Sequence, residues 1–136
     1  MLKQSPIPLW VTLFLIMLAL FQCTQVFVFY IDHAFLTDAG ISTQTDASLN
    51  LVYATAGRML ATIVATIFVI ILQSPPAFLA ILLMSMVREG QEMIIQPLFP
   101  YANSPASPTA MFILHALMFA IELAAFITVL RKYRST

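Results

Sequence analysis

The stretch LWVTLFLIMLALFQCTQVFVFYI, at residues 9–31, contains no Asp, Glu, Lys or Arg. It matches the roughly 20 apolar residues that an α-helix needs to cross the hydrocarbon core of a bilayer. The stretch is longer than the apolar region of a secretory signal, and no A-x-A-like cleavage site follows it. We therefore expect a retained transmembrane helix here.

Three more apolar segments of similar length follow along the chain. They lie at residues 49–73, 76–96 and 108–130. Ser74 before Pro75 suits a helix cap followed by a first-turn proline, and Ser107 before Pro108 repeats this pattern. Pro97 is expected to end the third helix. The pattern predicts an all-α fold, a single four-helix transmembrane bundle that spans residues 1–136.

The composition favours a membrane protein over a soluble one. Hydrophobic residues make up 61% of the chain and charged residues only 9%, whereas soluble domains carry about 25% charged residues. The formal net charge is zero, so we expect no nucleic-acid partner. Cys23 is the single cysteine, which excludes an intrachain disulfide and a CxxC site.

The positions of the basic residues predict the orientation. Lys3 precedes the first apolar segment, and Arg131, Lys132 and Arg134 follow the last. The loop at 32–48 has three aspartates and no Lys or Arg, and the loop at 97–107 has no charged residue. The positive-inside rule then places both termini in the cytoplasm.

Several polar residues interrupt the apolar segments. They are Gln22, Gln25, Arg58, Arg88, Glu89, Glu92, His115 and Glu122. If the five charged ones each faced lipid alone, the cost would be on the order of 12 kcal/mol. They must therefore face one another, a cavity or water. At 1.5 Å per residue most of them fall in the outer half of the bundle, so we expect a polar pocket or network there.

Two ion pairs are candidates within this network. Arg88 and Glu92 are four residues apart on one helical face, and Arg58 is a possible partner for Glu89. Such pairs could simply hold the helices in register, or they could form a binding site. Both interpretations stay open at this point.

His115 and Glu122 lie seven residues apart on one face of the fourth segment. His115 suits a hydrogen-bonded core residue better than a ligand. Glu122 is the best candidate to carry a proton. Met111 and Met118 beside them suit packing rather than metal binding, and we expect no metal site.

Small residues repeat every fourth position in the second segment, at Gly57, Ala61 and Ala65. This spacing lets transmembrane helices approach closely. We therefore expect this face to pack inside the bundle.

The chain resembles the DoxX-like superfamily of small four-helix membrane proteins. The resemblance is carried by the overall size, by Gly57-Arg58 early in the second segment, and by the arginine of REGQE (residues 88–92) in the third. It implies a four-helix bundle in a bacterial inner membrane. For some relatives it also implies a quinone-linked redox role or an accessory-subunit role.

Three functions fit these observations. The first is a non-catalytic module that contacts the lipid bilayer and binds a hydrophobic or quinone-like small molecule, or docks beside a larger membrane complex. The second is a membrane-embedded enzyme, an isomerase or quinone-linked redox subunit, in which Glu122 or Glu92 moves a proton and His115 assists. The third is a proton-coupled transporter with a relay through Glu122 and His115. The sequence identifies no cofactor.

Overall fold

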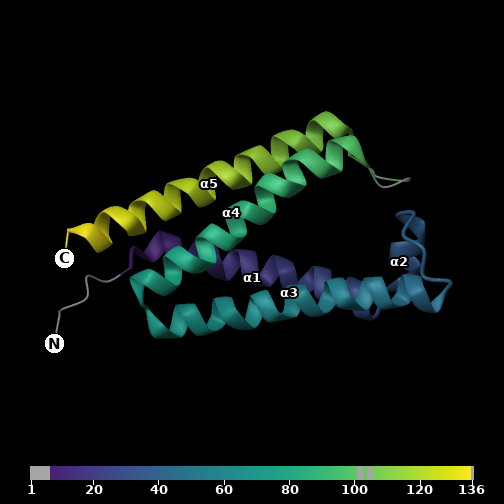
Figure 1. Cartoon of the computed structure of the whole chain (residues 1–136), viewed down its shortest axis with the longest axis horizontal. Coiled ribbons are helices and arrows are strands. Elements are labelled where there is room, and N and C mark those ends of the chain that lie inside the picture. The colour runs from purple at the N-terminus through teal and green to yellow at the C-terminus, as the bar shows by residue number, and fades with distance from the viewer. Residues whose placement is uncertain (1–6, 101–102, 104–105, 136) are drawn as a thin grey trace.

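The computed structural model describes residues 7–100, 103 and 106–135, and this part of the chain is helical with connecting turns. The helices are α1 (Leu9–Tyr30), α2 (His33–Asp38), α3 (Asp46–Leu72), α4 (Pro75–Leu98) and α5 (Pro108–Arg134) (Figure 1). The all-α prediction is confirmed. Each of the four predicted segments becomes one long helix, and α2 is an addition.

The helix ends differ from the predicted ones for local reasons. α3 begins three residues early, at Asp46, because Thr45 caps it and forms a reciprocal capping box with Ser48. α4 continues through Pro97 to Leu98, and the missing N–H of a proline in the last turn removes only one helical hydrogen bond. α5 extends to Arg134, so the basic residues predicted to follow it form its last turn.

Of the two predicted serine caps, only the one at the start of α5 forms. The Ser107 side chain accepts from the N–H of Ala110 at 3.2 Å, whereas Ser74 makes no side-chain cap. Gln73, with φ of 49° in the left-handed region, ends α3 and turns the chain into α4.

The short helix α2 was not predicted. Asp32 starts it by accepting from the N–H of Phe35 at 3.1 Å, and Leu36 is buried with 1% of its surface exposed. A helix of six residues shows too little periodicity to be recognised in a sequence.

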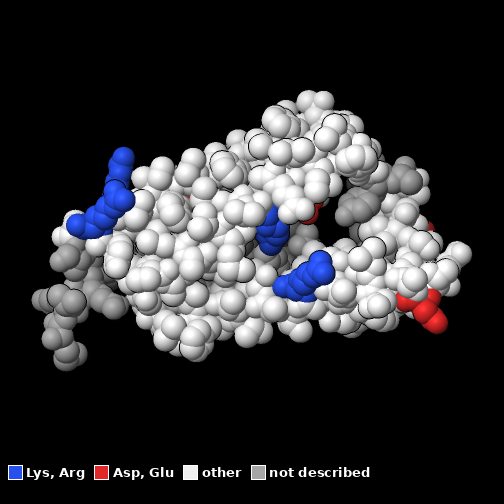
Figure 2. Space-filling model, viewed as in Figure 1, with Lys and Arg blue, Asp and Glu red and all other residues white. Residues whose placement is uncertain are grey.

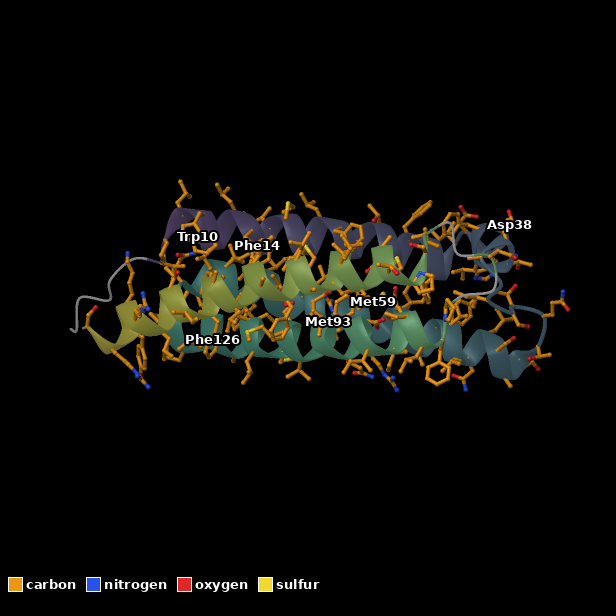
Figure 3. All side chains as sticks on the ribbon, turned by 90° about the horizontal axis from the view of Figure 1, so that it is seen from above. Trp10, Phe14, Asp38, Met59, Met93 and Phe126 are labelled. Carbon is orange, nitrogen blue, oxygen red and sulfur yellow. The ribbon has the colours of Figure 1, made fainter. Side chains whose placement is uncertain are left out.

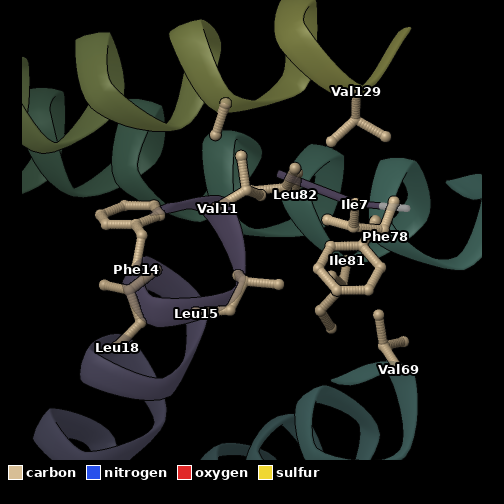
Figure 4. Packing of buried hydrophobic residues seen from close by; sticks show 11 residues of the cluster. Ile7, Val11, Phe14, Leu15, Leu18, Val69, Phe78, Ile81, Leu82 and Val129 are labelled. Atoms are coloured by element: carbon tan, nitrogen blue, oxygen red, sulfur yellow. The ribbon is translucent and has the colours of Figure 1, made fainter. Parts of the chain in front are cut away.

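The long helices pack as two antiparallel pairs, α1 with α3 and α4 with α5. All four meet at the end of the molecule where α1 begins and α5 ends, which we call the terminal end (Figure 1). A buried apolar cluster joins them there, with Phe78 and Leu82 of α4 between Leu15 of α1 and Val129 of α5 (Figure 4). This cluster is the core of the protein.

The two pairs diverge away from the terminal end (Figure 1). α3 and α4 touch over a short length beside their connecting turn, and α4 then follows α5 instead. At the opposite end, which we call the α2 end, the side-chain amide of Asn103 donates to the backbone oxygen of Asp38 at 2.8 Å. The part of the molecule where the pairs diverge therefore lies between an apolar core and this polar contact.

Three helices, α1, α3 and α5, are long and apolar enough to cross a membrane. α4 has 24 residues but carries Arg88, Glu89 and Glu92, so it is too polar to qualify on composition. Large apolar side chains cover the outside, where Leu9 is 71% exposed and Ile71 is 72% exposed. Figure 3 shows such side chains projecting along most of the length, between the ends marked by Trp10 and Asp38. This outer surface suits contact with lipid.

Candidate functional site

Glu89 of α4 is the centre of a buried polar cluster. Its Oε1 accepts from Nη2 of Arg88 at 2.8 Å, and its Oε2 lies 2.7 Å from Nδ1 of His115 on α5. The side chains of Glu89 and His115 are 9% and 13% exposed. The carboxylate thus has one partner on its own helix and one across the α4–α5 interface.

Gln22 brings the other helix pair into the cluster. With its amide oriented so that the oxygen faces the donors, the oxygen accepts from Nη1 and Nη2 of Arg88. Gln22 is 4% exposed. The contact runs from α1 to α4, so Arg88 links the two helix pairs. We call Gln22, Arg88, Glu89 and His115 the polar cluster.

A second polar contact joins α4 and α5 nearer the terminal end. The hydroxyl of Ser85 donates to Oε1 of Glu122 at 2.6 Å, and Glu122 is completely buried. Ser85 lies one turn before Glu89, and Glu122 lies two turns after His115. Because α4 and α5 are antiparallel, Ser85 and Glu122 are both displaced toward the terminal end relative to Glu89 and His115. The two contacts therefore follow one another along the α4–α5 interface.

Two buried polar atoms in this region have no hydrogen-bond partner among the described residues, Nε2 of His115 and Oε2 of Glu122. Because a carboxylate only accepts, Nδ1 of His115 carries the proton in its contact with Glu89. In the neutral imidazole, Nε2 is then an acceptor. Buried polar atoms usually have a partner, so these two atoms are candidates for contact with a ligand group or a water molecule.

The remaining predicted residues lie outside the polar cluster. Oε2 of Glu92 accepts from the amide of Gln96, one turn along α4, at 2.8 Å. Gln25 is half-buried and Arg58 is exposed. Neither makes a side-chain hydrogen bond or ion pair with another residue that the structure describes.

Both predicted ion pairs are therefore wrong. Arg88 turns to Glu89 rather than Glu92, because Glu89 faces α5 and is the more deeply buried carboxylate. Arg58 does not reach Glu89, since α3 and α4 pack together only near their connecting turn. The α4–α5 interface supplies His115 as the second partner instead.

Sequence reasoning also missed Ser85 as the partner of Glu122. The signal was present, because Ser85 and Glu89 are four apart on α4 and share a face. Recognising the contact required knowing that α4 pairs with α5 in this register.

Figure 2 shows that the molecule is hollowed between the two helix pairs on the side toward the α2 end, and we call this space the hollow. Basic side-chain atoms are visible beside it, and acidic atoms are visible within it (Figure 2). The sequence has two basic residues between Lys3 and Arg131, namely Arg58 on α3 and Arg88 on α4. Gln22, Glu89 and Glu122 are buried and the His115 side chain is only 13% exposed, so Arg88, whose side chain is 36% exposed, is the member of the polar cluster that reaches the surface.

The small-residue face of α3 does not pack inside the bundle as predicted. Ala61 and Ala65 are exposed, and with Leu60, Val64 and Phe68 they line an open apolar groove. At the α2 end of the groove, a Cβ on Gly57 would lie 3.7 Å from the Tyr30 hydroxyl. The opposite face of α3, which carries Val52, Ala56 and Ile63, is the buried one.

Compared with protein-family models, curated proteins and solved structures, the chain shows no significant match. The geometry of the site offers guanidinium donors, one imidazole acceptor and two buried carboxyl groups beside an accessible space. Such a set can hold the polar part of a small molecule whose apolar part faces the helices.

Proposed function

We propose that this chain is a membrane protein that binds an amphipathic small molecule in the hollow between its helix pairs. The main support for this proposal is that the polar cluster lies where the two helix pairs begin to separate. A cluster that only fixed helix register would be expected to satisfy its own polar atoms. Here Nε2 of His115 and Oε2 of Glu122 are left without partners among the described residues.

The proposal places all four long helices across a bilayer, with both termini in the cytoplasm. α4 joins the three apolar helices because Arg88 contacts α1, Glu89 contacts α5, and Glu92 accepts a hydrogen bond from Gln96. Lipid-facing charges cost about 2.5–3.5 kcal/mol each on insertion scales, and this placement avoids most of that cost. A bacterial inner membrane is the location that the resemblance implies.

The ligand's apolar part would enter from the bilayer between the pairs, since the outer surfaces of α1, α3, α4 and α5 are apolar. Its polar part would meet Arg88 and His115. A hydrophobic or quinone-like molecule with an oxygen-bearing head fits this description. A larger membrane complex is a compatible setting, because the open α3 groove leaves one face of the chain free of other described helices.

Native mass spectrometry of the gently solubilised chain tests the binding proposal. A small molecule should co-purify with the wild-type chain and be lost from His115→Leu, which leaves Arg88 and Glu89 paired. Leu117→Ala, on the exposed side of α5, is the matched control and should keep the molecule. A chain free of any small molecule under conditions that retain bulk lipid would contradict the proposal.

Labelling of single cysteines tests the orientation. In a Cys23→Ser background, Thr43→Cys in the α2–α3 loop should react with a membrane-impermeant thiol reagent in intact cells. Ser135→Cys, after α5, should react only after the membrane is opened. The reverse pattern would place the termini outside.

A membrane-embedded enzyme is the second candidate, and the Glu89–His115 contact favours it. A carboxylate that orients a histidine through Nδ1 and leaves Nε2 without a protein partner is the usual arrangement of a general base. The co-purified molecule separates the two functions. Conversion of that molecule to one of different mass, lost in His115→Gln, would establish an enzyme.

A further inference from the structure

Arg58 is a charged residue near the middle of α3 that does not belong to the polar cluster. It lies about 18 Å along α3 from the start of the helix at Asp46 and about 21 Å from its end at Leu72. The side chain is exposed and has no hydrogen bond or ion pair with another described residue. In a membrane-spanning helix, an unpaired arginine at this position costs free energy unless it reaches water or an anionic partner.

The carboxylates of the region are already occupied by other donors. Glu89 accepts from Arg88 and His115, Glu92 from Gln96, and Glu122 from Ser85. Arg58 sits on the other helix pair and contacts none of them. Its guanidinium therefore has five N–H donors available.

Arg88 also retains donor capacity. It uses Nη1 and Nη2 toward Gln22 and Glu89, and its side chain is 36% exposed. Arg88 lies on α4 and Arg58 lies on α3, so the two residues belong to opposite helix pairs, and basic side-chain atoms are visible beside the hollow (Figure 2). Two guanidiniums on opposite helix pairs thus border one space.

We propose that the ligand of the hollow carries an anionic oxygen head group, a phosphate or a carboxylate, held between Arg58 and Arg88. This inference rests on the proposed function and adds the chemical class of the ligand. Guanidinium groups bind both anions through paired, charge-assisted hydrogen bonds. The anion gives Arg58 the partner that the described residues do not provide.

Native mass spectrometry with added lipids tests this inference. The probes are phosphatidylglycerol, which carries a phosphate and hydroxyls, and diacylglycerol with the same acyl chains and no phosphate. The wild-type chain should retain phosphatidylglycerol about tenfold more than diacylglycerol, because charge-assisted hydrogen bonds are about twice as strong as neutral ones. Arg58→Gln should remove most of this preference, and Arg58→Lys should keep part of it.

Two matched variants serve as controls. Arg131→Gln removes a positive charge from the last turn of α5, far from the hollow, and should leave the preference unchanged. Glu92→Gln should leave it unchanged as well; a rise would mean that Glu92 competes for Arg58. Because Arg58 is exposed, we expect Arg58→Gln to fold, and its melting curve in the same detergent checks this.

Inorganic phosphate distinguishes the source of the anion. Displacement of phosphatidylglycerol by millimolar phosphate would indicate a site for soluble anions, and resistance to displacement would indicate a lipid site. Equal retention of both lipids, or a preference that survives Arg58→Gln, would overturn the inference. In that event binding of diacylglycerol alone would still support the proposed function, whereas retention of neither lipid would count against both.

Discussion

Glu89 and His115 are joined across the α4–α5 interface by a 2.7 Å contact between Oε2 and Nδ1. The same carboxylate holds Arg88, which in turn donates to Gln22 on α1. One buried carboxylate therefore supports the polar connection between the two helix pairs that runs through Arg88 and Gln22. Its loss should affect more than one helix.

Glu89→Ala should lower the free energy of unfolding by about 3–5 kcal/mol, the usual cost of removing one partner from a buried charge pair. The variant leaves the guanidinium of Arg88 buried in part without its carboxylate. Denaturant titration in a fixed detergent, followed by circular dichroism, measures the change. Glu92→Ala is the matched control, because Glu92 contacts only Gln96 of its own helix, and it should cost less than about 1 kcal/mol. Equal losses for the two variants would contradict the central role of Glu89.

The apolar cluster at the terminal end should dominate the stability of the whole chain, because it is the place where all four long helices meet. Phe78 is fully buried there. Phe78→Ala should cost about 3–5 kcal/mol through lost burial and an unfilled cavity. Leu83→Ala on the exposed side of the same helix, where the side chain is 51% exposed, should change stability by less than about 0.5 kcal/mol. Thermal melts in the same detergent compare the two variants, and a small effect of Phe78→Ala would mean that the helix pairs are held together elsewhere.

The outlines of the helices follow from the sequence, and their partners do not. Runs of apolar residues and the Ser107-Pro108 start predict where helices lie, because these signals are local. Whether Arg88 turns to Glu92 or to Glu89 depends on which helix covers α4. Spacing along one helix is the same in both cases, so periodicity cannot distinguish them.

The small-residue face of α3 illustrates the same limit. Gly57, Ala61 and Ala65 have the spacing of a close helix contact, yet Ala61 and Ala65 are exposed because α1 packs on the other face of α3. Small residues permit close approach without requiring it. The polar side chains were the better guide, since a buried charge requires a partner and four of the eight predicted residues lie in the polar cluster.

The sequence predicts that Ala61 packs against another helix, so that a larger side chain there would destabilise the protein. The exposed position of Ala61 predicts the opposite result. Ala61→Leu should change the free energy of unfolding by less than about 0.5 kcal/mol, because the added atoms enter an open groove. In a packed helix interface the same substitution would cost about 1–3 kcal/mol through overpacking. Val52→Phe on the buried face of α3, where Val52 is 3% exposed, is the positive control. Strong destabilisation by Ala61→Leu in the purified chain would mean that another helix covers the groove.

The Ser85–Glu122 contact predicts energetic coupling that a double-mutant cycle can measure. Ser85→Ala removes the only donor that the described residues offer to Glu122 and should cost about 1–3 kcal/mol, the usual penalty for leaving a buried polar group without a partner. Glu122→Leu removes the buried carboxyl and fills its space with an apolar side chain of similar size. Once the carboxyl is gone, the Ser85 hydroxyl has lost its acceptor, so adding Ser85→Ala should cost little or stabilise the chain. The free-energy change of the double variant should therefore differ from the sum of the two single-variant changes by at least about 0.5 kcal/mol. Additive effects would contradict the predicted coupling between Ser85 and Glu122. They would mean that a ligand or water molecule, and not Ser85, is the main hydrogen-bond partner of Glu122.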